Sequence, residues 1–288
     1  MAVTLPWAAP DPILPASAAR VLYDGIFAEP KLSHPEGVAV GPDGWVWAGN
    51  QDGDLCRIAP DGSAMERVAS TGGFALGLAF DGDRALFVCD MRHAAVFRLD
   101  LATRRLERFT EPGIRIPNVP LVDRARGRLI VSDSFDPAEP GPGLWSYDLD
   151  TGAGGLWCAA PMTFANGLAK RGDHLYVAET FARRVRRVPL AGGDPEPFAA
   201  DLPGLPDGLA FDAEGGLVVA CYEPSRLLRV DPSGEARVLV EDPTAHVLCH
   251  PTNVAFDGDR LLTANLGRWH VAEVAIDVGA PPLWTESA

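Results

Sequence analysis

Long hydrophobic runs are missing from this 288-residue sequence. A membrane-spanning helix needs about 20 consecutive apolar residues, and no segment approaches that length. The start of the chain, residues 1–15, is rich in alanine and proline and lacks the basic stretch that opens a secretory signal peptide. We therefore expect a soluble, cytoplasmic protein without a membrane partner.

Basic residues are also scarce. The chain has 25 Lys and Arg against 39 Asp and Glu, a formal net charge of -14. Binding to nucleic-acid phosphates requires clustered basic side chains, so we expect no nucleic-acid partner. The one basic run, residues 183–187, is interpreted as the outward face of a strand. Hydrophobic residues make up 47% of the chain, which is enough for a sizeable core.

Paired cysteines are the third absence. The five cysteines are odd in number, widely spaced and without a Cys-x-x-Cys pair, which argues against a disulfide framework and against a zinc–cysteine site. No stretch of helical length keeps a 3.6-residue apolar period either. What remains is a succession of short apolar runs bounded by Gly, Pro and Asp, which is typical of strands.

These runs belong to a unit that recurs six times. The aligned segments are residues 34–50, 75–90, 117–133, 165–180, 206–221 and 251–265. Each contains two apolar runs separated by a turn, and a third run and, in most units, a weaker fourth run follow. Six units of about 45 residues with four strands each predict an all-β, six-bladed β-propeller with antiparallel strands in every blade.

The ring of blades must also be closed. Residues 19–24 precede the first unit and resemble residues 236–241, so we predict that this N-terminal strand becomes the outermost strand of the last blade. Residues 281–285 are an alternative for the same place. No linker divides the units, so residues 19–288 are predicted to be one propeller domain, preceded by an extension of residues 1–18.

One position of the unit carries polar side chains selectively. Its occupants are Glu36, Leu76, Asn118, Asn166, Asp207 and Asn253, separated by 40, 42, 48, 41 and 46 residues. Asn-Gly and Asp-Gly pairs are common turn formers, which is one interpretation. Glutamate is a poor turn residue, however. Because the first strand of each propeller blade lines the central channel, these oxygens should converge there and favour a hard divalent cation, Ca²⁺ before Mg²⁺ or Mn²⁺.

From about Val21 to Val278 the chain resembles the SMP-30/gluconolactonase/LRE-like family of lactonase propellers. The most specific stretch runs from Leu205 to Tyr222, with Pro206-Asp207-Gly208, and is followed by the run 226–232. The resemblance implies that Glu36, Asn166 and Asp207 hold one divalent metal ion, Ca²⁺ first, with Mg²⁺, Mn²⁺ or Zn²⁺ as alternatives. It further implies that Asn118 places the substrate and that Asp207 acts as general base.

The sequence departs from that family around Asn118. Family members that act on sugar lactones often carry Arg two residues before this Asn, whereas here Ile116 holds that position and Arg115 comes one place earlier. The apolar residues expected near the channel mouth, which indicate a less polar ligand, are Phe74, Met162, Phe164 and Trp269. Further candidates for substrate contact are Arg115, His34, His250 and Trp269, and Asn253 is a candidate to support the ligands from behind.

We therefore predict a metal-dependent hydrolase that opens a lactone or related ester, with a small-molecule substrate and a monomeric or weakly homo-oligomeric state. No nucleophile elbow, P-loop or dinucleotide fingerprint competes with the axial site. Three alternatives stay open: a phosphorus-ester hydrolase, a metal-free condensing enzyme of the strictosidine-synthase-like type, and a non-catalytic interaction propeller. Fold alone does not choose among them.

Overall fold

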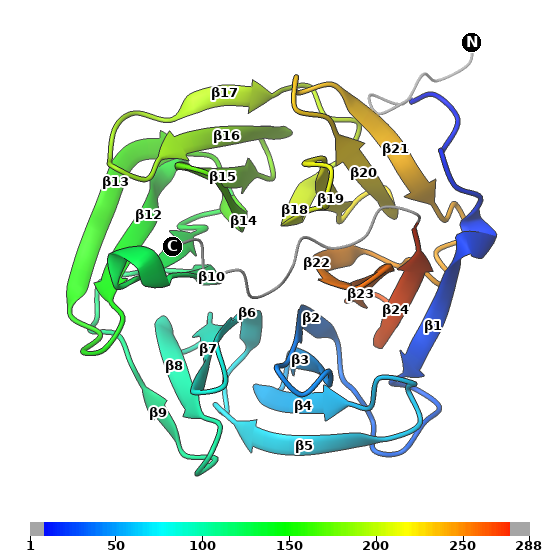
Figure 1. Ribbon diagram of the computed structural model, residues 1–288, viewed down its shortest axis with the longest axis horizontal. Coiled ribbons are helices and arrows are strands. Elements are labelled where there is room, and N and C mark those ends of the chain that lie inside the picture. The colour runs from blue at the N-terminus through cyan, green and yellow to red at the C-terminus, as the bar shows by residue number, and fades with distance from the viewer. Residues whose placement is uncertain (1–8, 277–288) are drawn as a thin grey trace.

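A computed structural model describes residues 9–276. Six four-stranded antiparallel sheets stand in a ring around a central channel (Figure 1). Apart from the strands, two short 3₁₀ helices lie within the described residues, η1 (Ala16–Ala18) and η2 (Arg124–Arg126). The predicted all-β, six-bladed propeller is confirmed.

The blades follow one another along the chain, and strands are given from the channel outward. Blade 1 comprises β2 (Pro35–Val40), β3 (Val46–Asn50), β4 (Asp54–Ile58) and β5 (Met65–Ser70); blade 2 comprises β6 (Ala75–Asp81), β7 (Ala85–Asp90), β8 (Ala95–Asp100) and β9 (Leu106–Arg108). Blade 3 comprises β10 (Pro117–Asp123), β11 (Arg128–Asp133), β12 (Gly141–Asp148) and β13 (Gly154–Met162); blade 4 comprises β14 (Ala165–Arg171), β15 (His174–Glu179), β16 (Arg184–Pro189) and β17 (Glu196–Ala199). Blade 5 comprises β18 (Pro206–Phe211), β19 (Leu217–Cys221), β20 (Arg226–Val230) and β21 (Ala236–Glu241); blade 6 comprises β22 (Pro251–Asp257), β23 (Arg260–Asn265), β24 (His270–Ala275) and β1 (Ala19–Asp24).

The N-terminal strand closes the ring, as predicted. Strand β1 pairs antiparallel with β24, in a register that sets Ala19 opposite Val274 and Asp24 opposite His270 (Figure 1). The first and last parts of the propeller are thereby joined in one sheet, which removes the open edge that β24 would otherwise present. The alternative closing segment, residues 281–285, lies outside the described residues.

Part of the predicted extension is attached to the propeller. The backbone N–H groups of Ile13 and Leu14 donate to the carbonyls of Val238 (3.0 Å) and Leu239 (2.8 Å) in β21. The chain thus touches blade 5 before it enters blade 6 as β1. The domain boundary at residues 18 and 19 stays a prediction.

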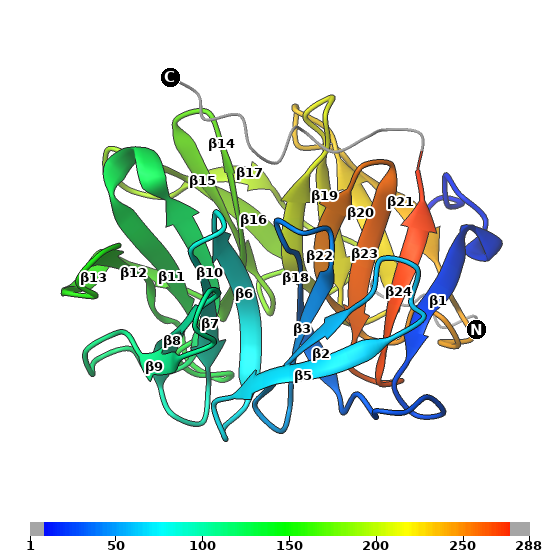
Figure 2. The ribbon, with the colours of Figure 1, turned by 60° about the horizontal axis from the view of Figure 1, so that its bottom comes forward.

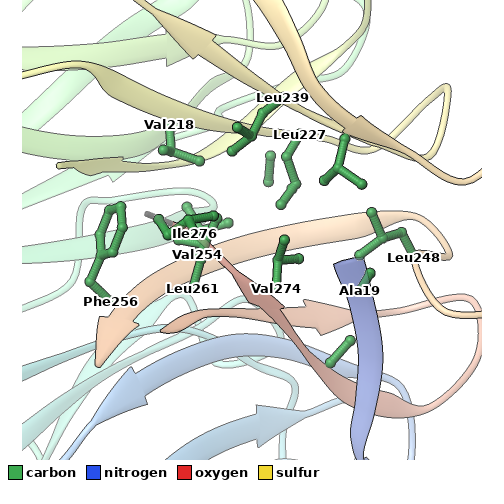
Figure 3. Close-up of a cluster of buried hydrophobic side chains, with 13 residues drawn as sticks. Ala19, Val218, Leu227, Leu239, Leu248, Val254, Phe256, Leu261, Val274 and Ile276 are labelled. Atoms are coloured by element: carbon green, nitrogen blue, oxygen red, sulfur yellow. The ribbon is translucent and has the colours of Figure 1, made fainter. Parts of the chain in front are cut away.

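Apolar side chains pack mainly between neighbouring blades. In the cluster of Figure 3, Val218 and Leu227 of blade 5 face Leu261 and Val274 of blade 6, and all four are buried. All five cysteines are buried and have free thiols. The sequence likewise argued against a disulfide framework. None of the helices in the described part of the chain has the length and apolarity to cross a membrane.

The innermost strands β2, β6, β10, β14, β18 and β22 border the channel (Figures 1 and 2). Each has a register irregularity beside its first residues, for example between Pro35 and Gly37 in β2 and between Pro206 and Leu209 in β18. A β-bulge bends the strand and changes the direction of a side chain. The same irregularity in every blade therefore gives one residue near the start of each inner strand a distinct direction. We call the place of this residue the axial position.

The strand register corrects one axial residue. Pro251 pairs with Asn265 as Pro35 pairs with Asn50 and Pro206 with Cys221. The residue that follows the first proline of β22 is Thr252, so Thr252, and not Asn253, is equivalent to Glu36 and Asp207. The assignment of Asn253 to this position was wrong by one residue, because the sequence of the last unit contains an Asn that imitates the pattern.

Candidate functional site

A cavity of about 290 Å³ opens at one end of the channel. Its polar lining includes the axial residues of five blades, namely Glu36, Asn118, Asn166, Asp207 and Thr252. The axial residue of blade 2 is Leu76, which also lines the cavity. The structure thus brings together the three predicted metal ligands and the predicted substrate-placing asparagine.

Two carboxyl groups share this enclosed space. Asp207 is 5% exposed. Burial, and then the neighbouring charge of Glu36, raise the pKa of Asp207 well above its usual range. Burial raises the pKa of Glu36 to about 7, although a hydrogen bond with Thr252 opposes the shift. Burial raises the pKa of a carboxyl group because it disfavours the charged form, and for Asp207 the like charge of Glu36 adds to the shift.

Two oxygen atoms of the site lack a hydrogen-bond partner among the described residues, although both are buried. They are Glu36 Oε2 and Asn166 Oδ1. A buried polar atom left unpaired costs about 1–3 kcal/mol, and buried polar atoms of native proteins are rarely left so. A cation between these oxygens would satisfy both, so the residues present fit a divalent metal ion.

The donor set favours a hard cation. Its members are two carboxylates and one or two carboxamides, all oxygen donors, and the described residues contain no group of three or more His, Cys, Asp or Glu with metal-binding geometry. Oxygen-only coordination of this kind suits Ca²⁺, Mg²⁺ or Mn²⁺, whereas zinc sites draw on His and Cys.

Hydroxyl groups fix the orientation of both asparagines. Asn118 Nδ2 donates to Ser134 Oγ (2.9 Å), which donates to the carbonyl of Ala165 (2.8 Å). Asn166 Nδ2 donates to Thr180 Oγ1 (3.2 Å), which donates to the carbonyl of Pro206 (2.8 Å). Because each amide nitrogen donates to a hydroxyl, the amide oxygen of each asparagine points away from that hydroxyl. Each hydroxyl also joins its blade to the next one, directly before the next axial residue.

A third hydroxyl joins the last blade to the first. Thr252 Oγ1 donates to the carbonyl of Glu36 (2.8 Å). Sequence reasoning missed Thr252, Ser134 and Thr180. A signal for the last two was present, since Asp133-Ser134 and Glu179-Thr180 both place a hydroxyl directly after an acid that ends the second strand.

Those acids hold the loops that lead into the inner strands. The Asp133 carboxylate accepts the backbone N–H groups of Arg115 (3.0 Å) and Ile116 (2.8 Å), just before β10. Glu179 accepts the N–H of Thr163 (2.8 Å), just before β14. Both acids are buried, and Glu179 also pairs with Arg184 at 2.9 Å. Through these loops, Asp133 and Glu179 position the axial asparagines Asn118 and Asn166.

The two predicted histidines stand beside the cavity. His34 Nδ1 lies 2.8 Å from the carbonyl of Leu266, and its ring packs against Trp269 with centroids 4.6 Å apart. His250 Nδ1 lies 2.9 Å from the carbonyl of Tyr222, on whose ring it stacks. Leu266 and Tyr222 line the cavity, so His34, His250 and Trp269 support its wall. Their contact with a substrate stays a prediction.

The remaining candidates lie farther away. Arg115 pairs with Asp136 at 2.9 Å and lies over the ring of Phe135. Asn253 lines a different cavity of about 340 Å³, formed by the later residues of the inner strands, and its Oδ1 accepts the N–H of Val254. Met162 is buried against Gly143 in blade 3. None of the three is among the described residues that line the axial cavity.

Apolar side chains form most of the wall above the axial oxygens. They are Phe74, Leu76, Met91, Ile116, Phe164, Phe181, Leu205, Tyr222 and Leu266. Phe74 and Phe164 were expected at the mouth and are found there. The site therefore combines a polar floor, where the oxygens converge, with an apolar surround.

Fold and site together define a six-bladed propeller with an axial cluster of oxygen donors. A family model described as "SMP-30/Gluconolactonase/LRE-like region" matches residues 76–265, and the chain belongs to this family. A second model, "Strictosidine synthase-like, N-terminal", matches residues 26–58. The expected family membership is thereby confirmed.

Two curated relatives illustrate the range of the similarity. Protein STRICTOSIDINE SYNTHASE-LIKE 6 of Arabidopsis thaliana is 30% identical over 211 residues, which cover 66% of this chain and 56% of the relative. The chain thus spans little more than half the length of that relative. A 6-deoxy-6-sulfogluconolactonase of Pseudomonas putida is 34% identical over 114 residues, covering 36% of this chain and 38% of the relative.

Solved structures share the fold. A regucalcin from Agrobacterium tumefaciens, described as a calcium-binding protein, aligns with a TM-score of 0.75 at 24% identity and covers 94% of this chain and 97% of its own. A gluconolactonase from Xanthomonas campestris aligns with a TM-score of 0.72 at 21% identity, covering 89% of both chains. At these identities the likeness establishes the architecture.

Proposed function

We propose that this protein is a hydrolase that opens a lactone or a related carboxylic ester at the axial site with the help of one divalent cation, Ca²⁺ first. The observation that carries the proposal is the pair of unpartnered buried oxygens, Glu36 Oε2 and Asn166 Oδ1, beside the carboxyl group of Asp207. The family membership and the neighbour described as calcium-binding support it.

Glu36, Asn166 and Asp207 would hold the cation. Two carboxylates match the double charge, and Ca²⁺ accepts six to eight oxygen ligands, so positions are left for water and substrate. When bound, the cation acts as a Lewis acid that polarises the substrate carbonyl and stabilises the negative charge that develops on its oxygen.

Asp207 would serve as the general base. As a carboxylate it accepts a proton from the attacking water, whose oxygen bonds to the acyl carbon. The ring C–O bond then breaks, and the proton passes to the leaving alkoxide, so that lactone and water give one hydroxy acid. A positioned general base contributes about 10²–10⁴-fold to such a reaction. Asn118, held by Ser134, would place the substrate.

A second candidate is a metal-free condensing enzyme of the strictosidine-synthase-like type. The observations that favour it are the 30% identity to the Arabidopsis relative and the match of residues 26–58, which include Glu36. The two candidates differ in whether Glu36 and Asp207 need a cation. A condensing activity that persists after chelation would support the second candidate.

The experiment is a panel of lactones, carboxylic esters and phosphorus esters, assayed with chelated protein and with added Ca²⁺, Mg²⁺, Mn²⁺ or Zn²⁺. We expect hydrolysis of a lactone or carboxylic ester only with a cation. Asp207→Ala should lower kcat by about 10²–10⁴-fold, the range for loss of a general base, while Asp201→Ala, an exposed aspartate of the same blade region, should not. Full activity of Asp207→Ala would overturn the proposal.

A further inference from the structure

We infer that the substrate is an uncharged compound with an apolar substituent, an alkyl or aryl lactone or ester, and that a polyhydroxylated sugar lactone fits the site poorly. The reaction in this statement rests on the proposed function, but binding of an apolar group to the cavity does not.

The wall offers few hydrogen bonds. It is built mainly from apolar side chains, among them Phe74, Ile116, Phe164, Phe181, Leu205 and Leu266, and Tyr222 contributes a phenol. The hydroxyls of Thr180 and Thr252 already donate to backbone carbonyls. A sugar ring carries a hydroxyl on nearly every carbon, and each one left without a partner on leaving water costs free energy. An alkyl or aryl group has no such requirement and gains from leaving water.

The charged side chains of the wall disfavour anionic substrates. Among the described residues that line the cavity, Glu36 and Asp207 are the charged ones, and none is Lys, Arg or His. Arg115, the arginine nearest in sequence to the axial asparagine, pairs with Asp136 outside the cavity. A carboxylate, phosphate or sulfonate on the substrate would meet no cationic side chain there. The ligand is therefore neutral apart from the reacting group.

The rim presents apolar side chains to solvent. Phe181 is 47% exposed and Met91 38% exposed, and both line the cavity. Exposed large apolar side chains gathered at a concave site mark ligand-binding surfaces. The ring of Phe181 packs against that of Phe164, with centroids 4.9 Å apart. Together they form one continuous apolar surface from the rim to the wall.

Phe164 adds a backbone observation. Its φ is +58°, a left-handed conformation that bulky residues rarely adopt. Such strained positions cluster at functional sites, where the surrounding structure fixes them. Here the carbonyl of Phe164 accepts the backbone N–H of Thr180 at 3.2 Å, which joins the strained residue to the residue whose hydroxyl orients Asn166. Thr180 thus contacts both Phe164 of the aromatic wall and the axial residue Asn166.

The first test is a series of δ-lactones with one ring and side chains of increasing length, from δ-valerolactone to δ-decalactone, together with glucono-δ-lactone. Each methylene that enters an apolar wall should raise kcat/KM about three- to fourfold until the cavity is filled. Glucono-δ-lactone should fall at least about tenfold below δ-decalactone. Equal or better turnover of the sugar lactone would overturn the inference and leave the proposed hydrolase intact.

Variants locate the effect. Phe181→Ser should lower the ratio of kcat/KM for δ-decalactone over δ-valerolactone about tenfold, because it removes the rim of the apolar surface. The matched control is Phe27→Ser, which removes a phenylalanine that is 84% exposed and lies outside the cavity. It should leave the ratio unchanged. An unchanged ratio in Phe181→Ser, or an equal fall in both variants, would contradict the assignment.

A binding measurement distinguishes failure of the proposed hydrolase from failure of the proposed apolar site. The lactam 6-pentylpiperidin-2-one has the shape of δ-decalactone but resists hydrolysis, so calorimetry reports its binding without turnover. We expect binding with a negative heat-capacity change that Phe181→Ser weakens and Phe27→Ser does not. Lactam binding without hydrolysis of any lactone would contradict the proposed function only. Absence of lactam binding, with lactones hydrolysed, would overturn the apolar site only.

Discussion

The side-chain amide of Asn166 donates to the hydroxyl of Thr180 over 3.2 Å, and this contact determines which atom of Asn166 is available to a ligand. The nitrogen is engaged, so the buried Oδ1 is left without a partner among the described residues. Thr180 is itself held, since its hydroxyl donates to the carbonyl of Pro206, next to Asp207. One hydroxyl therefore contacts the axial residue Asn166 of one blade and the residue before Asp207 in the next.

Replacing Thr180 by Val should consequently weaken cation binding. Outer contacts that orient metal ligands contribute about 10–100-fold to affinity, and Val preserves the shape without the hydroxyl. Titration calorimetry with Ca²⁺ on chelated protein measures the change. The matched control is Thr263→Val, a buried threonine of β23 that contacts the carbonyl of its neighbour Ala264. Equal affinities for both variants would contradict the positioning role.

The stability of metal-free protein should depend on pH through Glu36. Burial raises its folded-state pKa from 4.5 to about 7, so the folded state binds more protons than the unfolded state within that window. The free energy of unfolding contributed by Glu36 is therefore present below about pH 4.5 and lost as pH rises toward 7, by about 3 kcal/mol. Asp207, whose pKa is also raised, acts in the same direction.

Urea unfolding of chelated protein from pH 5 to pH 8 tests this slope. The wild-type curve should fall with pH relative to that of Glu36→Gln, which cannot ionise at this position. Saturating Ca²⁺ should remove most of the difference at pH 8, because a ligand that binds only the folded state stabilises it. Parallel curves for wild type and Glu36→Gln would show that the carboxyl does not carry the linkage.

Glu179 should matter for stability much more than an exposed acid does. It is fully buried, accepts the N–H of Thr163, and pairs with Arg184 and with Arg186, whose side chain is largely buried. Glu179→Ala leaves these donors without their acceptor, and breaking a buried pair from one side costs about 3–5 kcal/mol. In the same blade, Glu196 pairs with Arg187 at 2.9 Å, but these side chains are 48% and 41% exposed, so Glu196→Ala should cost at most about 1 kcal/mol. Thermal unfolding distinguishes the two costs, and equal shifts in Tm would contradict the account.

Closure of the ring should depend on β1. Deleting residues 1–24 removes this strand and exposes the edge of β24, so we expect a destabilised, aggregating protein. Deleting residues 1–12 keeps β1 and both backbone bonds to β21, and it should leave the fold intact. Size-exclusion chromatography and thermal unfolding report both outcomes. A monomeric, cooperatively folded protein without residues 1–24 would show that another segment closes blade 6.

The fold could be predicted because its signal is repeated. Six copies of one strand pattern give the blade number, and the similarity of residues 19–24 to residues 236–241 gives the closing strand. The axial site was largely predictable for the same reason, since Glu36, Asn118, Asn166 and Asp207 occupy one position of the unit. A repeat turns a local pattern into a spatial statement, because equivalent positions must meet at the axis.

What escaped prediction depends on register and on contacts across blades. The bulge in β22 places Thr252 at the axial position, and a one-residue difference cannot be read from a sequence in which Asn253 imitates the repeat. Ser134 and Thr180 act on residues 31 and 26 positions away, at Ala165 and Pro206. His34 and His250 face backbone carbonyls behind the cavity wall, which depends on loop conformations that a sequence pattern does not specify.

We propose that the axial oxygens bind one divalent cation. The most direct measurement is titration calorimetry of chelated protein with Ca²⁺, comparing the wild type with the double variant Glu36→Gln/Asp207→Asn, which keeps the shape of both side chains and removes their charge. The account predicts one binding site per chain in the wild type and none in the double variant. Undiminished binding in the double variant, or no binding of Ca²⁺, Mg²⁺ or Mn²⁺ in the wild type, would contradict it.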